Sequence, residues 1–410
     1  MEHPDHRRLG RELGIFATDE QCGAGLPLWL PAGAAIRIEI ERFVVALERR
    51  NGYQHVFTPE LGKRQLYERS GHWQHFQEDM YPPMEVGGEK AVLRPMNCPH
   101  HILVFATEPR VMRDMPVRLA ELGTMFRMER SGVVGGLSRV RQMTLNDGHV
   151  FCATEQIGEE IASILGMVEE AYRALAIPSP RYRLSLRGED RKYGGDQASW
   201  AKSEAMLRDS LDAHRLSYEE APGEAAFYGP KIDLQVDDPQ GREETLSTVQ
   251  VDFDLPGKFA LSFRRGKRSE RPVLIHRSIV STMERMVAHL LEVHNGALPP
   301  WLAPTHVVII PIVDDALDHA RHVRGRMREE DIRVELDDRD ATLSSRIRDA
   351  QRRRIPYIAV VGRQEADGGT VAVRLRDSTR LDPQPVESFL ALITQVLSSR
   401  SASLLPPDHS

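Results

Sequence analysis

The hydrophobic pattern of the chain changes at Trp301–Pro304, and this change constrains the fold more than any other feature. Beyond it lie a continuous apolar run at 307–310, a helical periodicity at 317–327 and a second apolar run at 357–361. Strands that alternate with helices in this way indicate a small α/β domain with a mainly parallel core. Before Trp301 the strand candidates are short and interrupted by turns, as expected of an antiparallel sheet.

We therefore expect an α+β chain with a larger domain over 1–302, a smaller α/β domain over 303–400 and a flexible tail over 401–410. Inside the first domain, Thr154 is placed to cap a helix that ends before Pro178. The buried face of that helix is predicted to comprise Ile157, Ile161, Ile164, Leu165, Val168 and Tyr172.

The composition is that of a globular protein in a reducing compartment. The chain has 410 residues, 41% of them hydrophobic, and a net charge of -6, which fits two or three soluble domains. Three cysteines, Cys22, Cys98 and Cys152, are too few and too scattered for a disulfide framework. No apolar stretch reaches the roughly 18 residues of a membrane span, and the polar N-terminus is no signal peptide. The expected location is the cytoplasm.

Cys98, His149 and His276 are candidate metal ligands, each embedded in a distinctive segment. One thiolate and two imidazoles fit a zinc ion with an open coordination position, which is the pattern of catalytic zinc sites. The alternative is that Cys98 is a small core residue and that each histidine is a satisfied core residue. Composition alone favours that alternative, and the segments around the three residues reverse the preference.

Arginines stand at several points around these residues. Phe126-Arg127-Met128-Glu129 is followed by a glycine-containing loop at 132–136 and then by Arg139-Val140-Arg141, which together predict an antiparallel hairpin. Thr282-Met283-Glu284-Arg285 opens an apolar helix shortly after His276. Arginines at such positions can bind phosphate oxygens bidentately.

These segments resemble the class II aminoacyl-tRNA synthetases. Phe126–Glu129 is similar to motif 2 of that class, the segment from His276 to Arg285 to motif 3, and Phe57-Thr58-Pro59-Glu60, after an amphipathic helix at 36–47, to motif 1. Further strings resemble the threonyl-tRNA synthetases: Ser70-Gly71-His72-Trp73, Arg94-Pro95-Met96-Asn97-Cys98-Pro99, Phe227-Tyr228-Gly229-Pro230-Lys231, Thr248-Val249-Gln250-Val251-Asp252-Phe253 and Trp301-Leu302-Ala303-Pro304. The resemblance extends from about Arg8 to about Val396.

The resemblance implies an antiparallel class II sheet flanked by helices and a smaller α/β anticodon-binding domain. It also implies a two-step reaction, in which ATP and threonine form an adenylate and the threonyl group then moves to tRNA(Thr). The catalytic residues would be Arg127, Lys231 and Arg285. ATP, with Mg²⁺, would be bound by Arg127, Glu129, Arg139, Met143, Thr245 and Arg285.

The same resemblance assigns the amino-acid site and the anticodon site. One zinc ion per chain on Cys98, His149 and His276 would select threonine through its amino group and hydroxyl, with serine as the characteristic error. Other substrate contacts would come from Met96, Asp147, Tyr228, Thr248 and Gln250. Anticodon contacts would come from Asp340, Arg346, Glu365 and Arg374, although Asp340 replaces an asparagine of the family. A homodimer is implied through motif 1.

Besides Asp340, four positions in the first domain depart from the family pattern. Leu145 and Thr245 each replace a glutamine, Met143 replaces a phenylalanine, and Ser281 replaces a glycine of motif 3. The chain also begins at the catalytic domain, so we expect no editing in cis and consider a second or inhibitor-tolerant copy of the synthetase. Two alternatives remain open at this point: an enzyme that loads threonine or another β-hydroxy amino acid onto a carrier protein, and a non-catalytic tRNA-binding paralogue.

Overall fold

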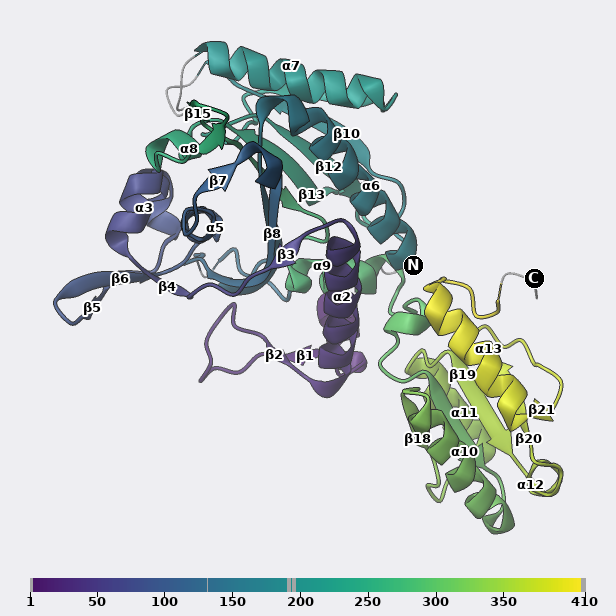
Figure 1. The fold of residues 1–410 in the computed structure, drawn as a ribbon. Coiled ribbons are helices and arrows are strands. Elements are labelled where there is room, and N and C mark those ends of the chain that lie inside the picture. Colours follow the sequence, from purple (N-terminus) through teal and green to yellow (C-terminus); the bar gives the residue numbers. More distant parts are fainter. Residues whose placement is uncertain (1–2, 131, 190–192, 194–196, 407–410) are drawn as a thin grey trace.

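The computed structural model describes residues 3–130, 132–189, 193 and 197–406. Its centre is an eight-stranded sheet in which all neighbouring strands are antiparallel except the two outermost pairs (Figure 1). In spatial order the strands are β11 (Tyr218–Pro222), β10 (Arg181–Leu186), β12 (Lys231–Asp237), β13 (Glu243–Asp252), β16 (Val273–Ser278), β9 (Gln142–Cys152), β8 (Val117–Phe126) and β3 (Gln54–His55). The predicted antiparallel class II architecture is confirmed.

Long helices pack against this sheet because each presents an apolar face at helical spacing. They are α2 (Pro31–Arg50), α6 (Ile157–Leu175), α7 (Gln197–Ala213) and α9 (Met283–Val293). The predicted face of α6 is buried throughout. The predicted cap is wrong, because Thr154 starts a 3-10 turn (Thr154–Gln156) and Gln156 is the N-cap, without a side-chain cap hydrogen bond.

Shorter elements complete the N-terminal body. The helices are α1 (His6–Glu12), α3 (Arg64–Ser70), α4 (His72–Phe76), α5 (Cys98–Phe105) and α8 (Leu255–Lys258). Three small sheets pair β1 (Phe16–Ala17) with β2 (Leu28–Trp29), β4 (Leu61–Lys63) with β6 (Glu89–Leu93) and β5 (Met84–Val86), and β7 (Arg110–Val111) with β14 (Phe263–Arg265) and β15 (Arg268–Glu270). No helix within the described residues is long and apolar enough to cross a membrane.

The C-terminal part forms its own sheet, in the order β18-β17-β19-β20-β21, with β18, β17 and β19 parallel. The strands are β17 (Val307–Pro311), β18 (Val334–Leu336), β19 (Tyr357–Val361), β20 (Thr370–Leu375) and β21 (Gln384–Pro385); the helices are α10 (Leu317–Glu329), α11 (Leu343–Arg352), α12 (Arg363–Gly368) and α13 (Val386–Ser399). The predicted order of strands and helices and the parallel core are confirmed.

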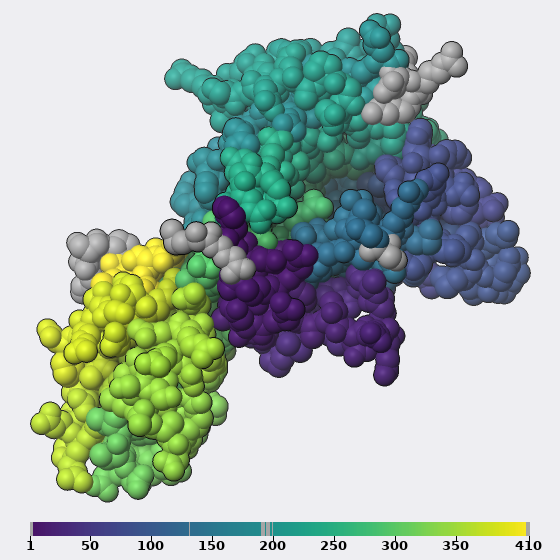
Figure 2. Space-filling model, turned by 180° about the vertical axis from the view of Figure 1, so that it is seen from behind, coloured from purple at the N-terminus to yellow at the C-terminus, as the bar shows by residue number. Residues whose placement is uncertain are grey.

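The N-terminal body and the C-terminal lobe are joined by polar contacts of Arg333 with α2 and with the segment at 301–303. Arg333 donates to Glu39 of α2 (2.9 Å) and to the carbonyls of Trp301 and Ala303 (2.8 and 3.0 Å). From behind, the C-terminal lobe lies beside the N-terminal segment of the chain (Figure 2). At the predicted tail, the carbonyl of Leu404 accepts a hydrogen bond from Tyr357 (2.9 Å), whereas 407–410 lie outside the described residues.

Candidate active site

A cavity of about 270 Å³ opens beside the central strands of the large sheet and the start of α9. Strands β8, β9, β12, β13 and β16 contribute its lining because they are neighbours in the sheet. Eleven of the predicted site residues line it: Met96, Cys98, Arg127, Met143, Asp147, Tyr228, Thr245, Thr248, Gln250, His276 and Arg285. Residues from seven separate segments therefore converge on one chamber.

Arg127 and Arg285 give this cavity a positive charge. Neither guanidinium makes an ion pair with any described residue, although both line the cavity. Burial lowers the pKa of Arg127, as does the nearby charge of Arg285, against the opposing effect of Glu129. Two close, unpaired guanidinium groups repel each other and favour an anion with several oxygens between them.

Three other predicted residues, Glu129, Arg139 and Lys231, are not among the residues that line the cavity, and each is in an ion pair. Arg139 donates to the Glu129 carboxylate at 2.9 Å from Nε and lies 2.8 Å from it at Nη2. Lys231 donates to Asp233 (2.6 Å), whose other oxygen accepts from Thr248 (3.1 Å). Binding of a nucleotide by Glu129 and Arg139 would therefore require their ion pair to open.

The candidate metal ligands come together as predicted. One donor atom from each of Cys98, His149 and His276 lies within 4.8 Å of the other two, and all three residues are buried. His149 and His276 are direct partners on β9 and β16, so their side chains share one face of the sheet. Cys98 reaches them from the first residue of α5.

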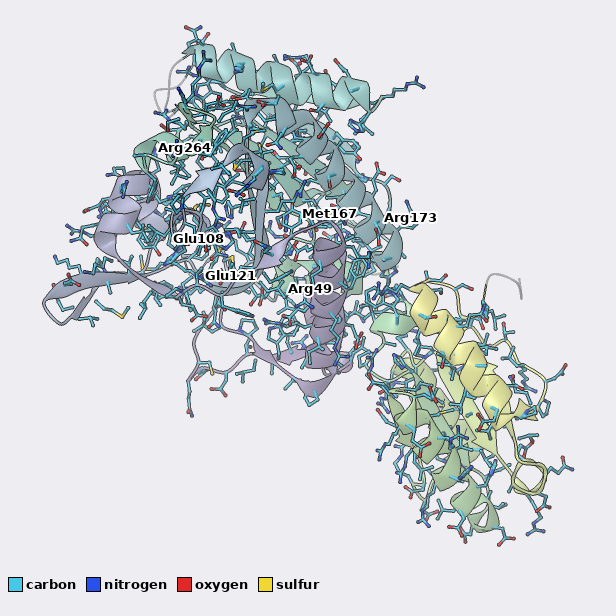
Figure 3. The ribbon with its side chains drawn as sticks, viewed as in Figure 1. Arg49, Glu108, Glu121, Met167, Arg173 and Arg264 are labelled. Atoms are coloured by element: carbon cyan, nitrogen blue, oxygen red, sulfur yellow. The ribbon has the colours of Figure 1, made fainter. Side chains whose placement is uncertain are left out.

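When both histidine rings are neutral, the hydrogen bonds behind them assign their protons. Nε2 of His101 donates to Glu121 (3.1 Å), so its Nδ1 accepts from Nδ1 of His149 (2.8 Å). Nε2 of His276 donates to Asp252 (3.0 Å). Carboxylates that orient ligating histidines in this manner are usual around protein-bound metals. Glu121 ends the series of hydrogen bonds that starts at His149, and it is buried inside the N-terminal body (Figure 3).

This assignment leaves a lone pair on Nε2 of His149 and another on Nδ1 of His276, 2.9 Å apart. Two lone pairs so close repel each other unless a cation lies between them. Two nitrogens bound to one tetrahedral zinc ion would be about 3.3 Å apart. Burial and the charges of Asp147 and Asp252 raise the pKa of the Cys98 thiol, and a cation would favour its thiolate. The donor set therefore fits zinc.

Polar groups beside this cluster can hold a small polar ligand. Burial raises the pKa of Asp147, whose Oδ1 lies 4.0 Å from Nδ1 of His149. The Tyr228 hydroxyl donates to Gln250 (2.5 Å), and Gln250 donates to Thr248 (3.3 Å). These side chains line the same cavity as the two free arginines.

The positions that depart from the family pattern also lie at the cavity. Leu145, Thr245 and Ser281 line it with Met143. Ser281 has φ 58°, a left-handed conformation that favours glycine, which explains the family's preference at this point. Leu145 packs with Met143 and two further apolar residues, so that wall is apolar.

The predicted anticodon residues lie in different parts of the C-terminal lobe: Arg346 is on α11, Glu365 on α12 and Arg374 on β20, whereas Asp340 lies in the loop before α11. Asp340 is exposed, Arg374 is on β20, and Glu365 accepts from the backbone N–H of Gly362 (2.8 Å). Arg346 is buried and donates to the carbonyl of Asp337 (2.9 Å), which ties its guanidinium to the protein.

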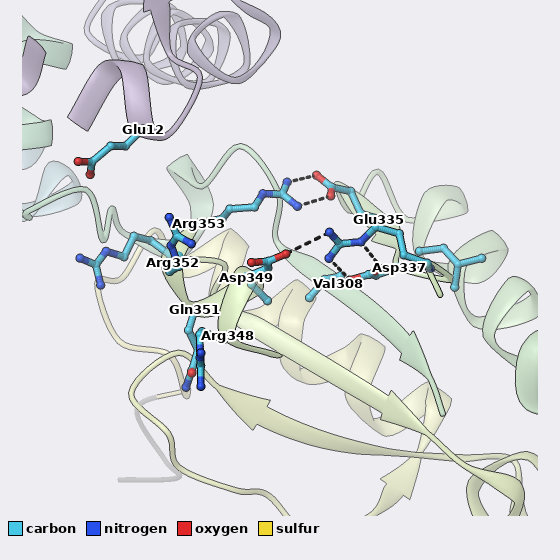
Figure 4. Close-up of a pocket in the computed structure, with 13 residues that line it drawn as sticks. Glu12, Val308, Glu335, Asp337, Arg348, Asp349, Gln351, Arg352 and Arg353 are labelled. Carbon is cyan, nitrogen blue, oxygen red and sulfur yellow. Dashed lines mark hydrogen bonds and ion pairs between the residues drawn. The ribbon is translucent and has the colours of Figure 1, made fainter. Parts of the chain in front are cut away.

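A second, open cavity of about 810 Å³ lies beside α11, where arginines gather (Figure 4). Arg353 pairs with Glu335 (2.6 and 2.7 Å), whereas Arg348 and Arg352 make no ion pair within the described ranges of the chain. Free arginines on an exposed face can bind phosphates.

Sequence reasoning did not single out His101, Glu121, Asp233 or Arg277. Arg277 is buried, lines the cavity and pairs with Glu48 of α2 (2.7 Å). The spacing of Cys98 and His101 was a usable signal, because residues three apart share one face of a helix. Glu121 had no such signal, because His101 and Arg94, its partners, come from segments distant in sequence. Asp233 lies two residues from its partner Lys231, on the same face of β12.

Comparisons with known proteins agree with this geometry. The family model of the tRNA synthetase class II core domain (G, H, P, S and T) matches residues 84–294, and that of the anticodon binding domain matches 306–395. A threonine--tRNA ligase of Lactiplantibacillus plantarum is 49% identical over 97% of this chain and 62% of the relative. Threonine--tRNA ligase 1 of Bacillus subtilis is 50% identical over 90% of this chain and 58% of the relative. The chain thus spans about three-fifths of the length of these curated relatives.

Two solved structures are similar over nearly their full length. One, described as the RNA binding domain of threonyl-tRNA synthetase from Cryptosporidium parvum, has a TM-score of 0.91 at 32% identity and covers 97% of this chain, which covers 99% of it. A putative threonyl-tRNA synthetase from Aeropyrum pernix has a TM-score of 0.86 at 26% identity, with 98% of each chain covered.

Proposed function

The chain belongs to the class II tRNA synthetases, and from this premise we propose that it activates L-threonine with ATP and transfers the threonyl group to tRNA(Thr). The observation that carries the proposal is the one cavity lined both by two unpaired arginines and by Cys98 and His276 of the Cys/His/His cluster. An anion with several phosphate oxygens and a small amino acid with polar groups fit its two ends.

The arginines account for the first step. Arg127 would neutralise the α-phosphate of ATP and the attacking carboxylate, while Arg285 and Arg139 would hold the distal phosphates, with Mg²⁺ on the nucleotide. Glu129 would face the adenine amine once its pair with Arg139 opens. Lys231 would act through its partner Asp233, which lines the cavity. This chemistry depends on placing charges more than on moving a proton.

The cluster accounts for the choice of amino acid. Cys98, His149 and His276 would hold one zinc ion, which supplies open coordination positions for the amino nitrogen and the hydroxyl oxygen of threonine. Asp147 would accept the hydrogen bond of that hydroxyl, and Tyr228 would lie near the amino group, with Met96, Thr248 and Gln250 completing the pocket. Valine has no oxygen to offer, whereas serine differs by one methyl, worth roughly 1 to 3 kcal/mol.

The assembly state and location belong to the same proposal. Phe57, in the segment similar to motif 1, is 95% exposed, and Leu61, four residues further along, is also exposed. Large apolar side chains that face water commonly mark a contact with another protein. We propose a homodimer through this surface, in the cytoplasm, where tRNA is available. The free arginines near α11 and the residues Asp340, Arg346, Glu365 and Arg374 would meet the RNA.

Charging of a transcribed tRNA with threonine identifier bases tests the acceptor. We expect threonyl-tRNA to form, and an altered anticodon to lower kcat/KM by about 100-fold, since losing direct base contacts costs a few kcal/mol. Acid-gel separation of charged and uncharged tRNA provides the measurement. Threonine activation without any charging would instead favour a carrier-type acceptor, and RNA binding without activation would favour a non-catalytic role.

A further inference from the structure

His6 lies at the point where three distant segments of the chain meet. It is the first residue of α1, and α1 packs against α9. The side chain is only 7% exposed. Asp5 caps the helix by accepting from the backbone N–H of Arg7 (2.7 Å), so the position of His6 is fixed from both sides.

Both ring nitrogens of His6 are occupied. Nε2 accepts a hydrogen bond from the backbone N–H of Leu137 (3.2 Å), so the ring proton is on Nδ1, which donates to Glu292 (2.7 Å). The backbone N–H of His6 donates to the same carboxylate oxygen (3.1 Å). Asp5, His6 and Glu292 are near enough to hold a metal ion, but the hydrogen bonds of the ring identify a protein clamp instead.

The clamped turn has room for nothing larger than glycine. Gly136 has φ +52°, and a Cβ placed there would lie 2.2 Å from Nε2 of His6. Leu137 is fully buried. Backbone hydrogen bonds between Gly135 and Arg139 (3.1 and 3.4 Å) close the turn. The backbone of Arg139 therefore belongs to the turn that His6 contacts.

Glu292, at the other end of the clamp, shares a helix with Arg285. Seven residues separate them, which is two turns and about 10 Å along one face of α9. The N-terminus of that helix is fixed by Thr282, whose side chain accepts from the N–H of Arg285 (3.1 Å). The clamp therefore connects the backbone under Arg139 to the helix that carries Arg285.

We propose that His6 is a positioning residue that fixes the Gly135–Arg139 turn against α9 and thereby sets the distance between Arg139 and Arg285. The ligand of these arginines, the distal phosphates of ATP, rests on the proposed function. The clamp itself rests only on the contacts. Because the Arg139 side chain must leave Glu129 to reach a nucleotide, the turn beneath it has to stay in place while the side chain moves.

Two nearly isosteric substitutions separate the two ends of the clamp. His6→Asn keeps a donor where Nδ1 lies, so it retains the contact with Glu292 and loses the acceptor for Leu137. His6→Gln places its amide oxygen where Nε2 lies, so it keeps the acceptor. Calorimetric titration of the full chain with Mg-ATP gives the affinity, and hydrogen–deuterium exchange of the 135–139 amides reports on the turn. Arg11→Ala, at an exposed position of α1, is the matched control.

For His6→Asn we expect a Kd for Mg-ATP about 10-fold higher than that of the unchanged chain and faster amide exchange in the turn, with threonine affinity unchanged. His6→Gln should stay within about threefold of the unchanged chain. Equal Kd and equal exchange for the unchanged chain and His6→Asn would overturn the proposal, as would equal losses for ATP and threonine in both variants.

The same measurements distinguish a failure of the proposed function from a failure of the His6 clamp. If the unchanged chain binds no Mg-ATP, the nucleotide role of the site is wrong, while the amide exchange of the turn still decides whether His6 holds it. If His6→Asn does not fold, Gly136→Ala makes the same test, because its Cβ would lie 2.2 Å from Nε2 of His6 and would force the turn and the ring apart. Unchanged amide exchange and ATP affinity in Gly136→Ala would then contradict the clamp.

Discussion

Arg127→Ala is expected to lower threonine-dependent ATP–pyrophosphate exchange by on the order of 10³-fold, the usual cost of losing a group that stabilises transition-state charge. Arg127 is one of two guanidinium groups that line the cavity without an ion pair among the described residues. Among the described residues, no other cation lines the cavity at the end of β8. The loss should appear in kcat more than in the KM for threonine, because charge develops during attack on the α-phosphate.

Arg127→Lys separates charge from shape. Lysine keeps the charge and loses the two-pronged donor, so we expect a defect intermediate between those of the unchanged chain and Arg127→Ala. Arg130→Ala, three residues further along the same loop and largely exposed, is the matched control and should retain exchange. Exchange by Arg127→Ala within about tenfold of the unchanged chain would show that the residue has no part in the reaction.

Cys98→Ser is expected to reduce bound zinc to well below one ion per chain and threonine-dependent exchange by more than about 100-fold. The hydroxyl is a poor substitute for a thiolate, and the two remaining nitrogens cannot complete the site alone. Zinc is measured by plasma mass spectrometry on protein dialysed against buffer with trace zinc. Removal of zinc by a chelator from the unchanged chain should give the same loss, and restored zinc should reverse it.

Cys152→Ala is the matched control for this variant. Cys152 is also buried and free, but it belongs to the apolar core and not to the cluster. Its substitution should leave the zinc content at one per chain. A Cys98→Ser protein that keeps a full equivalent of zinc would show that the thiol is no ligand, whatever happens to activity.

Much of the fold was predictable because local patterns and tertiary contacts agree. The apolar runs at 307–310 and 357–361 became adjacent parallel strands, and the hairpin after Arg127 joins β8 to β9. The cap of α6 was missed because Thr154 is used in a 3-10 turn that precedes the helix. The first residue of α6 depends on where the preceding strand β9 ends, and the ends of strands and helices are difficult to predict from sequence alone.

The site was predictable only in part. Cys98, His149 and His276 were recognisable through their surrounding motifs, and the sheet register brings the two histidines together. The hydrogen bonds that connect His149 through His101 to Glu121 were not recognisable from the sequence, because these residues lie on β9, α5 and β8 and share no periodicity. The pairing of Arg139 with Glu129 was not predicted either, because the two side chains meet across the loop that joins β8 to β9.

The most direct test of the account is ATP–pyrophosphate exchange by zinc-loaded protein with a panel of all twenty amino acids. We predict the highest kcat/KM with threonine, a serine signal lower by roughly 10- to 200-fold and a still weaker response to valine. No exchange with threonine, or a clear preference for an amino acid without a side-chain hydroxyl, would contradict the proposal that this cavity selects threonine.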